Sequence, residues 1–511
     1  MSGSPYKQLH EIKCGPVNTS DRLNLVDVSN NGYIATVADK AILLYNVERY
    51  LKANSDCSLR KDKPLPDHSS DVRISVTDPV FWLAFNNEGL VLAVATSDTS
   101  KGTLVHLLDL KEALKHSACN LSDVSRPIRV CGGEGLTADG HPGWEIRDFA
   151  WNPTIPALFV TILRSGAVRL LNATPNATEP DELVDQLPST ADARCLSWST
   201  KGKQLAICIT GTLTTQTGPT CGPLILQTDP KLRLKRIVPL NTLKDQMGAG
   251  SVFCPLDILW TSPSCFIIGL QSLSKTTNNT MNALMINAPS AYLRIPLLKQ
   301  TKSTEVTFSE IPDLRLHPES VHCQYYWRAI GSGHFIATPS EGGEQLHVFQ
   351  ISSGSTSPLI SVAQIELPPS GFVLGLAMGF YWPYSPSGDR SKVVAYLITR
   401  LTNGNLAPYA LRMREVLSPI IAALPEPVEL PVPPVPSAAP VSSSSAEPRS
   451  QSPFQTANTT GPISTSQNPN LIFNNRLEAT PDSTFAGLSR GSSFGAISQP
   501  SKKTVVITDF P

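Results

Sequence analysis

Two glycine-containing motifs are the first places in this chain to look for chemistry. Residues Gly487–Gly491 read GLSRG and match the GxSxG pattern of a serine nucleophile. That chemistry needs a strand-turn-helix to hold the serine and a later histidine to accept its proton, but the last histidine, His347, precedes Ser489. The run Cys131–Gly135 reads CGGEG and lacks both the Lys-Ser/Thr of a phosphate loop and the GxGxxG spacing. We interpret the first as a chance match and the second as a loop.

Metal ligands are the next candidates, and their spacing gives no support for a metal site. The 10 cysteines stand singly, without a CxxC pair. The pairs His317 with His322, and His334 with His347, could bind a metal only if the fold brought carboxylates to them. We therefore predict no catalytic residue, no cofactor and no metal.

Charge also excludes a function class. The 42 basic and 42 acidic residues cancel, which argues against a general nucleic-acid-binding domain. One local exception is KLRLKRI, where strand spacing would put Lys231, Arg233 and Lys235 on one face and Leu232 and Leu234 on the other. We favour a solvated outer strand here, and a phosphate-backbone contact is the alternative.

The elements that would position any site are short strands, and residues 146–171 show their plan. Residues 146–151 alternate with the period of a strand and end at Asn152-Pro153, which breaks the run. A second apolar run covers 157–163, a tight turn follows at 164–166, and a third run covers 167–171. The spacing predicts a three-stranded antiparallel meander.

This plan repeats along the chain. Six further units begin near Leu23, Val80, Ala193, Leu256, Tyr325 and Leu374. Six of the 7 tryptophans fall in the units at about one each, and we expect them to pack between neighbouring sheets: Trp82, Trp151, Trp198, Trp260, Trp327 and Trp382. The repeats predict an all-β fold, a seven-bladed WD40-like β-propeller. Its blades are degenerate, because Leu170-Leu171 stand where Trp-Asp would close a strand and Arg164 stands where a turn aspartate is expected.

The composition changes near residue 416. We predict a β-propeller over 1–415 and a disordered Pro/Ser-rich tail over 416–511, because such a segment cannot bury enough apolar surface to order itself. The run Pro431–Pro436 could form polyproline II and bind an SH3-like groove, or serve as a linker. No signal peptide and no apolar run of membrane-spanning length is found, so we expect an intracellular protein with no membrane insertion.

Specific residues add a family resemblance. The segments IRDFAWNPTIPALFVTILRSGAVRLL from Ile146, LPSTADARCLSWSTKGKQLAI from Leu187 and LDILW from Leu256 resemble blades of the N-terminal propeller of the CAN-type FG nucleoporin, on the cytoplasmic face of the nuclear pore. The resemblance is close over about 140–210, recognisable from 255 to about 350, and weaker elsewhere. The dipeptide Phe494-Gly495 fits the FG repeat that transport receptors bind.

The resemblance implies a partner and a site. The family's propeller binds the DEAD-box helicase of mRNA export through a lateral surface, in competition with RNA. Mapped here, that surface includes Glu341 and Glu344 of the SEGGEQ loop and Gln350 on the next strand, although a solvated turn is the alternative for the two glutamates. Nuclear transport receptors and other nucleoporins are further expected partners, and direct nucleic-acid binding is not expected.

The chain departs from the family after the propeller. The family continues through coiled coils into a domain dense in FG repeats, whereas this sequence has no heptad run after 416. It would then be a fragment or a version without the coiled-coil anchor. Two alternatives stay open: a propeller adaptor unrelated to the pore, and an enzyme, which clustered carboxylates or histidines in the central channel would favour.

Overall fold

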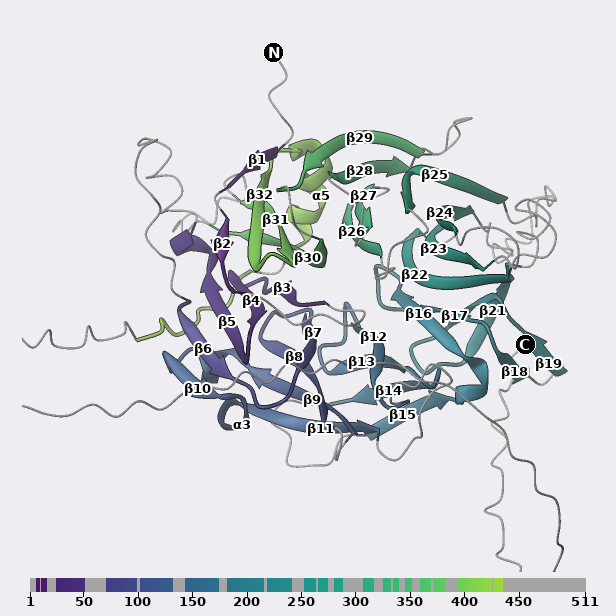
Figure 1. Ribbon diagram of the computed structural model, residues 1–511, viewed down its shortest axis with the longest axis horizontal. Helices are drawn as coiled ribbons and strands as arrows, with labels where there is room; N and C mark the ends of the chain where they lie inside the picture. Colours follow the sequence, from purple (N-terminus) through teal and green to yellow (C-terminus); the bar gives the residue numbers. More distant parts are fainter. Residues whose placement is uncertain are drawn as a thin grey trace, which may run out of the picture. The chain divides into compact units, whose positions relative to one another are not determined.

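The computed structural model describes most of the chain up to residue 434 (Figure 1). All described residues belong to one compact unit. They are 6–9, 11–15, 24–50, 70–98, 102–131, 143–173, 182–215, 218–240, 252–262, 265–273, 280–287, 307–316, 325–331, 334–339, 345–351, 359–368, 372–382, 393–424 and 426–434.

The described strands form seven sheets of four or five strands, which follow one another along the chain. The first sheet contains β3 (Val26–Val28), β4 (Tyr33–Ala38), β5 (Ala41–Asn46) and β6 (Val72–Ser75), with β10 (Ala118–Asn120) parallel to β6. The second contains β7 (Val80–Phe85), β8 (Val91–Asp98), β9 (Gly102–Asp109) and β11 (Ser125–Cys131). The third contains β12 (Ile146–Trp151), β13 (Leu158–Leu163), β14 (Val168–Asn172) and β15 (Glu182–Leu187).

The later sheets have the same antiparallel order. The fourth contains β16 (Ala193–Trp198), β17 (Leu205–Ile209), β20 (Leu224–Thr228) and β21 (Leu234–Pro239), with a separate hairpin of β18 (Thr212–Thr215) and β19 (Gly218–Cys221). The fifth contains β22 (Val252–Ser262), β23 (Cys265–Leu273), β24 (Thr280–Asn287) and β25 (Thr307–Leu316). The sixth contains β26 (Tyr325–Gly331), β27 (His334–Pro339), β28 (Gln345–Ile351) and β29 (Leu359–Glu366).

The seventh sheet joins both ends of the propeller. It contains β30 (Val373–Tyr381), β31 (Val394–Leu401) and β32 (Asn405–Leu411), and β32 pairs with the N-terminal strands β1 (Tyr6–Gln8) and β2 (Ile12–Lys13). Helical segments among the described residues are short: residues 47–50, α2 (Leu110–Ala113), α3 (Leu121–Val124), the 3-10 turn η1 (Ser189–Ala191) and α5 (Arg414–Ala423).

The inner strands close a ring. Each of β3, β7, β12, β16, β22, β26 and β30 lies next to the one that follows it, and β30 lies next to β3 (Figure 1). The backbone N–H of Leu25 donates to the carbonyl of Leu374 across that last junction, at 3.1 Å. The prediction of an all-β propeller is therefore confirmed.

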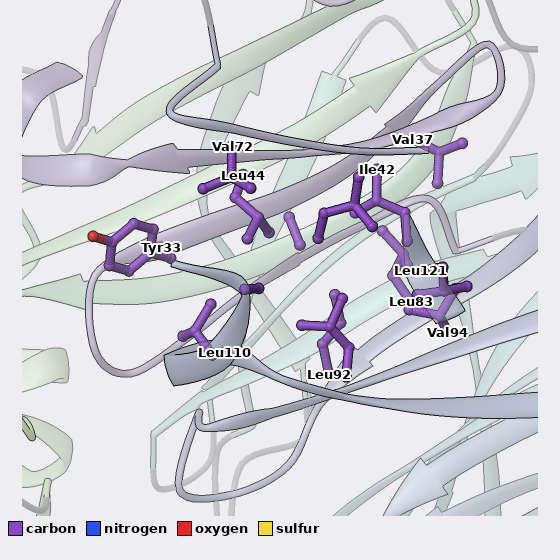
Figure 2. Close-up of a cluster of buried hydrophobic side chains, with 14 of the residues drawn as sticks. Tyr33, Val37, Ile42, Leu44, Val72, Leu83, Leu92, Val94, Leu110 and Leu121 are labelled. Carbon is purple, nitrogen blue, oxygen red and sulfur yellow. The ribbon is translucent and has the colours of Figure 1, made fainter. Parts of the chain in front are cut away.

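Packing between the sheets explains why the middle strands are buried on both faces, as in β4 and β13, where every residue is buried. Figure 2 shows one interface, in which Ile42 and Leu44 of the first sheet meet Leu83, Leu92 and Val94 of the second. All five side chains are fully buried. Burying a side chain of this size contributes about 1.5–3 kcal/mol, so each sheet is stabilised by both of its neighbours.

The packed region continues past residue 415, where the sequence analysis begins the tail. Leu417 of α5 is buried in the cluster between the sixth and seventh sheets. Beyond the helix, the backbone N–H of Val428 donates to Asn31 Oδ1 at 2.8 Å, and Leu430 packs against the cluster between the first two sheets. The expected polyproline run is described only to Pro434, and the rest of the tail lies outside the described residues.

Candidate functional site

Three residues are expected from the resemblance to form a docking surface, and only Gln350 can be placed, on β28 of the sixth sheet. Gln350 is exposed near the end of β28 and stands opposite Ile360 of β29 in the register. Glu341 and Glu344 lie outside the described residues, so their part in this surface stays a prediction. The same holds for Phe494-Gly495 and for Ser489.

Apolar residues that were not predicted from the sequence lie on the strand next to Gln350. Ile360 is 45% exposed and Val362 is 44% exposed, and both belong to β29, at the edge of the sixth sheet. The signal that could have found them is the strand period of LISVAQIE, in which Ile360 and Val362 share a face with the polar Gln364 and Glu366. Gln350, Ile360 and Val362 are called the β28–β29 surface below.

A concave feature lies elsewhere, in the central channel, which has a volume of about 350 Å³. It is lined by residues of six inner strands, including five of the expected tryptophans and three aspartates: Trp82, Trp151, Trp198, Trp260, Trp327, Asp27, Asp148 and Asp257. Arg328 of β26 also lines it. Tryptophan, aspartate and arginine side chains can bind a ligand or hold the sheets together. The hydrogen bonds and packing contacts of each residue show which of these roles it has.

The tryptophans bind one sheet to the next. Trp151, Trp198, Trp260 and Trp327 are buried, and each belongs to a cluster shared with the preceding sheet. The indole Nε1 of Trp198 donates to the carbonyl of Ala150 in the preceding inner strand at 3.3 Å. For these four residues the predicted packing role is confirmed. Trp382 differs, because it is only half-buried and lines a small pocket of about 90 Å³.

The channel carboxylates also hold backbone groups. Asp27 Oδ2 accepts the N–H of Phe85 at 2.6 Å, and Asp148 Oδ2 accepts the N–H of Leu196 at 2.9 Å, in each case across a sheet junction. Asp257 Oδ1 accepts the N–H of Ile258 at 2.8 Å. Burial raises the pKa of Asp27 above its ordinary value, and the nearby positive charge of Arg328 offsets only part of this rise.

Of the two histidine pairs considered as possible metal ligands, only His334 and His347 can be placed. His334 stands opposite Gln350 and His347 stands opposite Ala337, so the two histidines occupy different positions along adjacent strands. Within the part of the chain that the structure describes, no group of three or more His, Cys, Asp or Glu residues could hold a metal ion. His317 and His322 lie outside that part, as does most of the Cys131–Gly135 run.

The prediction for the basic KLRLKRI segment is wrong in its geometry. Lys231 and Arg233 precede β21, which begins at Leu234, and the intervening Leu232 has a φ of 55° and is buried. Asp229 causes this turn, because its Oδ1 accepts the N–H groups of Lys231 and Arg233 at 2.9 and 3.0 Å. Its Oδ2 pairs with Arg233 at 2.8 Å, so the segment is not a continuous basic face.

The closed ring of sheets defines the fold as a β-propeller. No family model matches the chain. It is 23% identical to the human nuclear pore complex protein Nup214 over 272 residues, which is 53% of this chain and 12% of that relative. The chain thus spans only a small part of the relative that it matches.

Solved structures show the same fold. The N-terminal domain of Nup159 has a TM-score of 0.50 and 13% identity, covering 80% of this chain and 95% of that one. A Saccharomyces cerevisiae complex of variant Dbp5 with Nup159, variant Gle1, IP6 and ADP contains a chain with a TM-score of 0.51 and 12% identity, with the same coverages of 80% and 95%. The predicted resemblance to the N-terminal propeller of the CAN-type nucleoporins is confirmed. No helix among the described residues has the length and apolarity needed to span a membrane.

Proposed function

We propose that this chain is a nucleoporin propeller that binds the DEAD-box helicase of mRNA export at the cytoplasmic face of the nuclear pore. The observation that carries the proposal is the sequence similarity to Nup214, which covers 272 residues. The solved structure with a TM-score of 0.51 contains Nup159 in complex with Dbp5, and this supports a helicase as the partner.

The β28–β29 surface is the part of the propeller that we propose as the contact. Gln350 offers an amide that can donate and accept, and Ile360 and Val362 add exposed apolar area beside it. A centre of apolar contacts with polar groups around it is the usual composition of a protein interface. In this proposal, the charges of Glu341 and Glu344 speed the association with the helicase and fix its orientation on the propeller, and they add less to the affinity.

The proposed function is binding rather than catalysis. The channel carboxylates Asp27 and Asp148 are each bonded to a backbone N–H of the next sheet, which supports a structural role for them. We also propose a propeller domain that extends to residue 434, followed by a tail in which Phe494-Gly495 meets transport receptors.

Calorimetric titration of the full chain with the same organism's mRNA-export helicase tests the proposal. We expect binding that single-stranded RNA abolishes, because the two ligands compete for the helicase. Heat that is unchanged by RNA would contradict the competition. The absence of binding at any workable concentration would instead favour the second candidate, a propeller adaptor unrelated to the pore.

A further inference from the structure

Two arginines of neighbouring sheets occupy equivalent irregular positions. In β12, Ile146 and Asp148 pair with adjacent residues of β13, so the residue between them has no partner in the register. In β16, Ala193 and Cys195 pair with adjacent residues of β17 in the same way. Arg147 and Arg194 are the extra residues of these two β-bulges. A bulge re-aims a side chain away from the regular faces of its sheet, and both residues lie where an inner strand begins, next to channel-lining strand segments.

The group between these arginines is Asp192. It has a φ of 46°, and its Oδ2 pairs with Arg194 Nη2 at 2.5 Å and accepts the hydroxyl of Thr210. Arg194 Nε also donates to Thr210 Oγ1 at 3.1 Å. Asp192 is thus closely engaged with Arg194, and its other oxygen lies 3.8 Å from Arg147 Nη1.

A third arginine adds to the positive charge nearby. Arg164 pairs with Glu145 at 2.9 Å, and its charge lies close enough to contribute to lowering the pKa of Arg147. The three arginines and the two carboxylates leave one positive charge in excess. We call Arg147, Arg164, Arg194, Asp192 and Glu145 the arginine cluster.

The excess positive charge of the arginine cluster belongs to Arg147. Its side chain is 17% exposed, and the Ala193 carbonyl, at 3.3 Å from Nη1, is the one hydrogen-bond acceptor that it contacts within the described residues. A guanidinium has five N–H donors in a planar fork. Burial, with the neighbouring Arg194 charge, lowers the pKa of Arg147 to about 10, so the side chain is still charged at neutral pH.

We propose that Arg147, with Arg194 beside it, binds a carboxylate side chain of an acidic peptide segment at the end of the channel where β12 and β16 begin. A guanidinium fork matches a carboxylate in bidentate geometry. A carboxylate carries one negative charge, which equals the excess of the cluster, whereas a phosphate dianion would exceed it. This site lies on the third and fourth sheets and is independent of the β28–β29 surface on the sixth.

The test uses the full chain and a labelled, end-blocked peptide in which Glu alternates with Gly. Anisotropy at low ionic strength gives its Kd, and the same peptide with Gln in place of Glu is the ligand control. We expect Arg147→Gln to weaken binding of the Glu peptide by about tenfold or more, since a hydrogen bond to a charged group is lost. Arg233→Gln removes an equal charge from the ion pair with Asp229 and should leave the Kd unchanged.

Two further measurements keep the outcome decisive. Arg147→Lys keeps the charge but removes the fork, so it should weaken binding less than Arg147→Gln does; it also serves if the Gln variant does not fold. Inorganic phosphate is titrated as a competitor and should displace the peptide only weakly. Equal affinities of the wild type and both Arg147 variants, equal binding of the Glu and Gln peptides, or stronger binding of phosphate than of the peptide would each overturn the proposal.

Discussion

The indole Nε1 of Trp151 donates a hydrogen bond of 2.9 Å to the backbone carbonyl of Ala84, in the preceding sheet. The ring of Trp151 also contacts Phe149 and Phe159, with centroids 5.7 and 5.1 Å away. Trp151 also belongs to the buried cluster that the second and third sheets share, so one side chain fills this interface and satisfies a backbone group of the second sheet. The junction between the second and third sheets depends on both properties.

Replacing Trp151 with Phe should separate these two contributions. Trp151→Phe keeps an aromatic ring but leaves the Ala84 carbonyl without its donor, which we expect to lower the free energy of unfolding by about 1–3 kcal/mol. Trp327→Phe is the matched control, because Trp327 is buried and its Nε1 has no hydrogen-bond partner among the described residues. Urea midpoints measure both, and an equal loss in the two variants would contradict the role of the hydrogen bond.

Gly202 should not tolerate even a methyl group. It has a φ of +63°, and a Cβ there would lie 2.5 Å from Asn152 Oδ1, whose amide donates back to the Gly202 carbonyl at 2.9 Å. Gly32 has a φ of +82° with nothing within 4 Å of its Cβ position, so Gly32→Ala carries only backbone strain, about 1–2 kcal/mol. We expect Gly202→Ala to lower the melting temperature clearly more than Gly32→Ala. Similar values would show that Asn152 moves aside easily.

Asp27 should make the protein less stable as the pH rises. Burial raises the pKa of its carboxyl in the folded state. The group's contribution is therefore complete below the unfolded pKa, about 3.9, and is lost as the pH passes through the higher folded value. Asp27→Asn keeps an acceptor for the Phe85 N–H without the charge, so we expect it to raise the urea midpoint at neutral pH.

A second variant at position 27 is the control for these urea measurements. Asp27→Ala removes the acceptor of the Phe85 N–H and should destabilise the protein at every pH. If Asp27→Asn were instead less stable than the wild type at neutral pH, the attraction between Asp27 and Arg328 would outweigh the effect of burial.

Helix α5 should contribute to the stability of the propeller. Leu417 is 2% exposed, and Leu417→Ala should lower the free energy of unfolding by about 2–4 kcal/mol through the cavity it leaves. Glu415→Ala, at an exposed position of the same helix, is the control and should have little effect. Ending the chain at residue 415 should lower the melting temperature relative to an end at 434, and equal melting temperatures would support the earlier boundary.

The β28–β29 surface gives a functional prediction. Ile360→Glu should weaken helicase binding by about tenfold without changing the melting temperature, because it places a charge in the proposed apolar contact. Leu183→Glu is the same kind of change at a residue that is 50% exposed on β15 of another sheet, and it should leave binding unchanged. Calorimetric titration distinguishes the two. Equal affinities would exclude Ile360 from the interface.

The sequence predicted the features that depend on periodicity. Strand alternation and the spacing of Trp151, Trp198, Trp260 and Trp327 were sufficient for the propeller and for the packing of these residues between sheets. Periodicity does not reveal a residue that is inserted into a strand, so the bulges at Arg147 and Arg194 and the charge between them were not predicted.

Other differences between the predicted and the observed structure arise where local interactions compete with the strand pattern. The Asp229 carboxylate closes a turn that places Leu232 in the left-handed region, which side-chain alternation does not foretell. The Pro/Ser-rich composition after residue 416 suggested disorder, yet Leu417, Ile420 and Ile421 of α5 pack on the sixth and seventh sheets. Tertiary burial thus outweighs the poor helix propensity of this segment.

The pairing of β1 with β32 has a consequence for how the protein is made. Tyr6 of β1 pairs with Leu411 of β32, so β1 cannot form this pairing during synthesis until β32 has been made. Contacts of such high sequence separation slow folding, and each doubling of the intervening loop adds about 0.6 kcal/mol of closure entropy. During synthesis the first and last sheets each expose a face that the finished ring covers. Chaperones that shield apolar sheet faces should therefore bind the nascent chain until residue 411 has emerged.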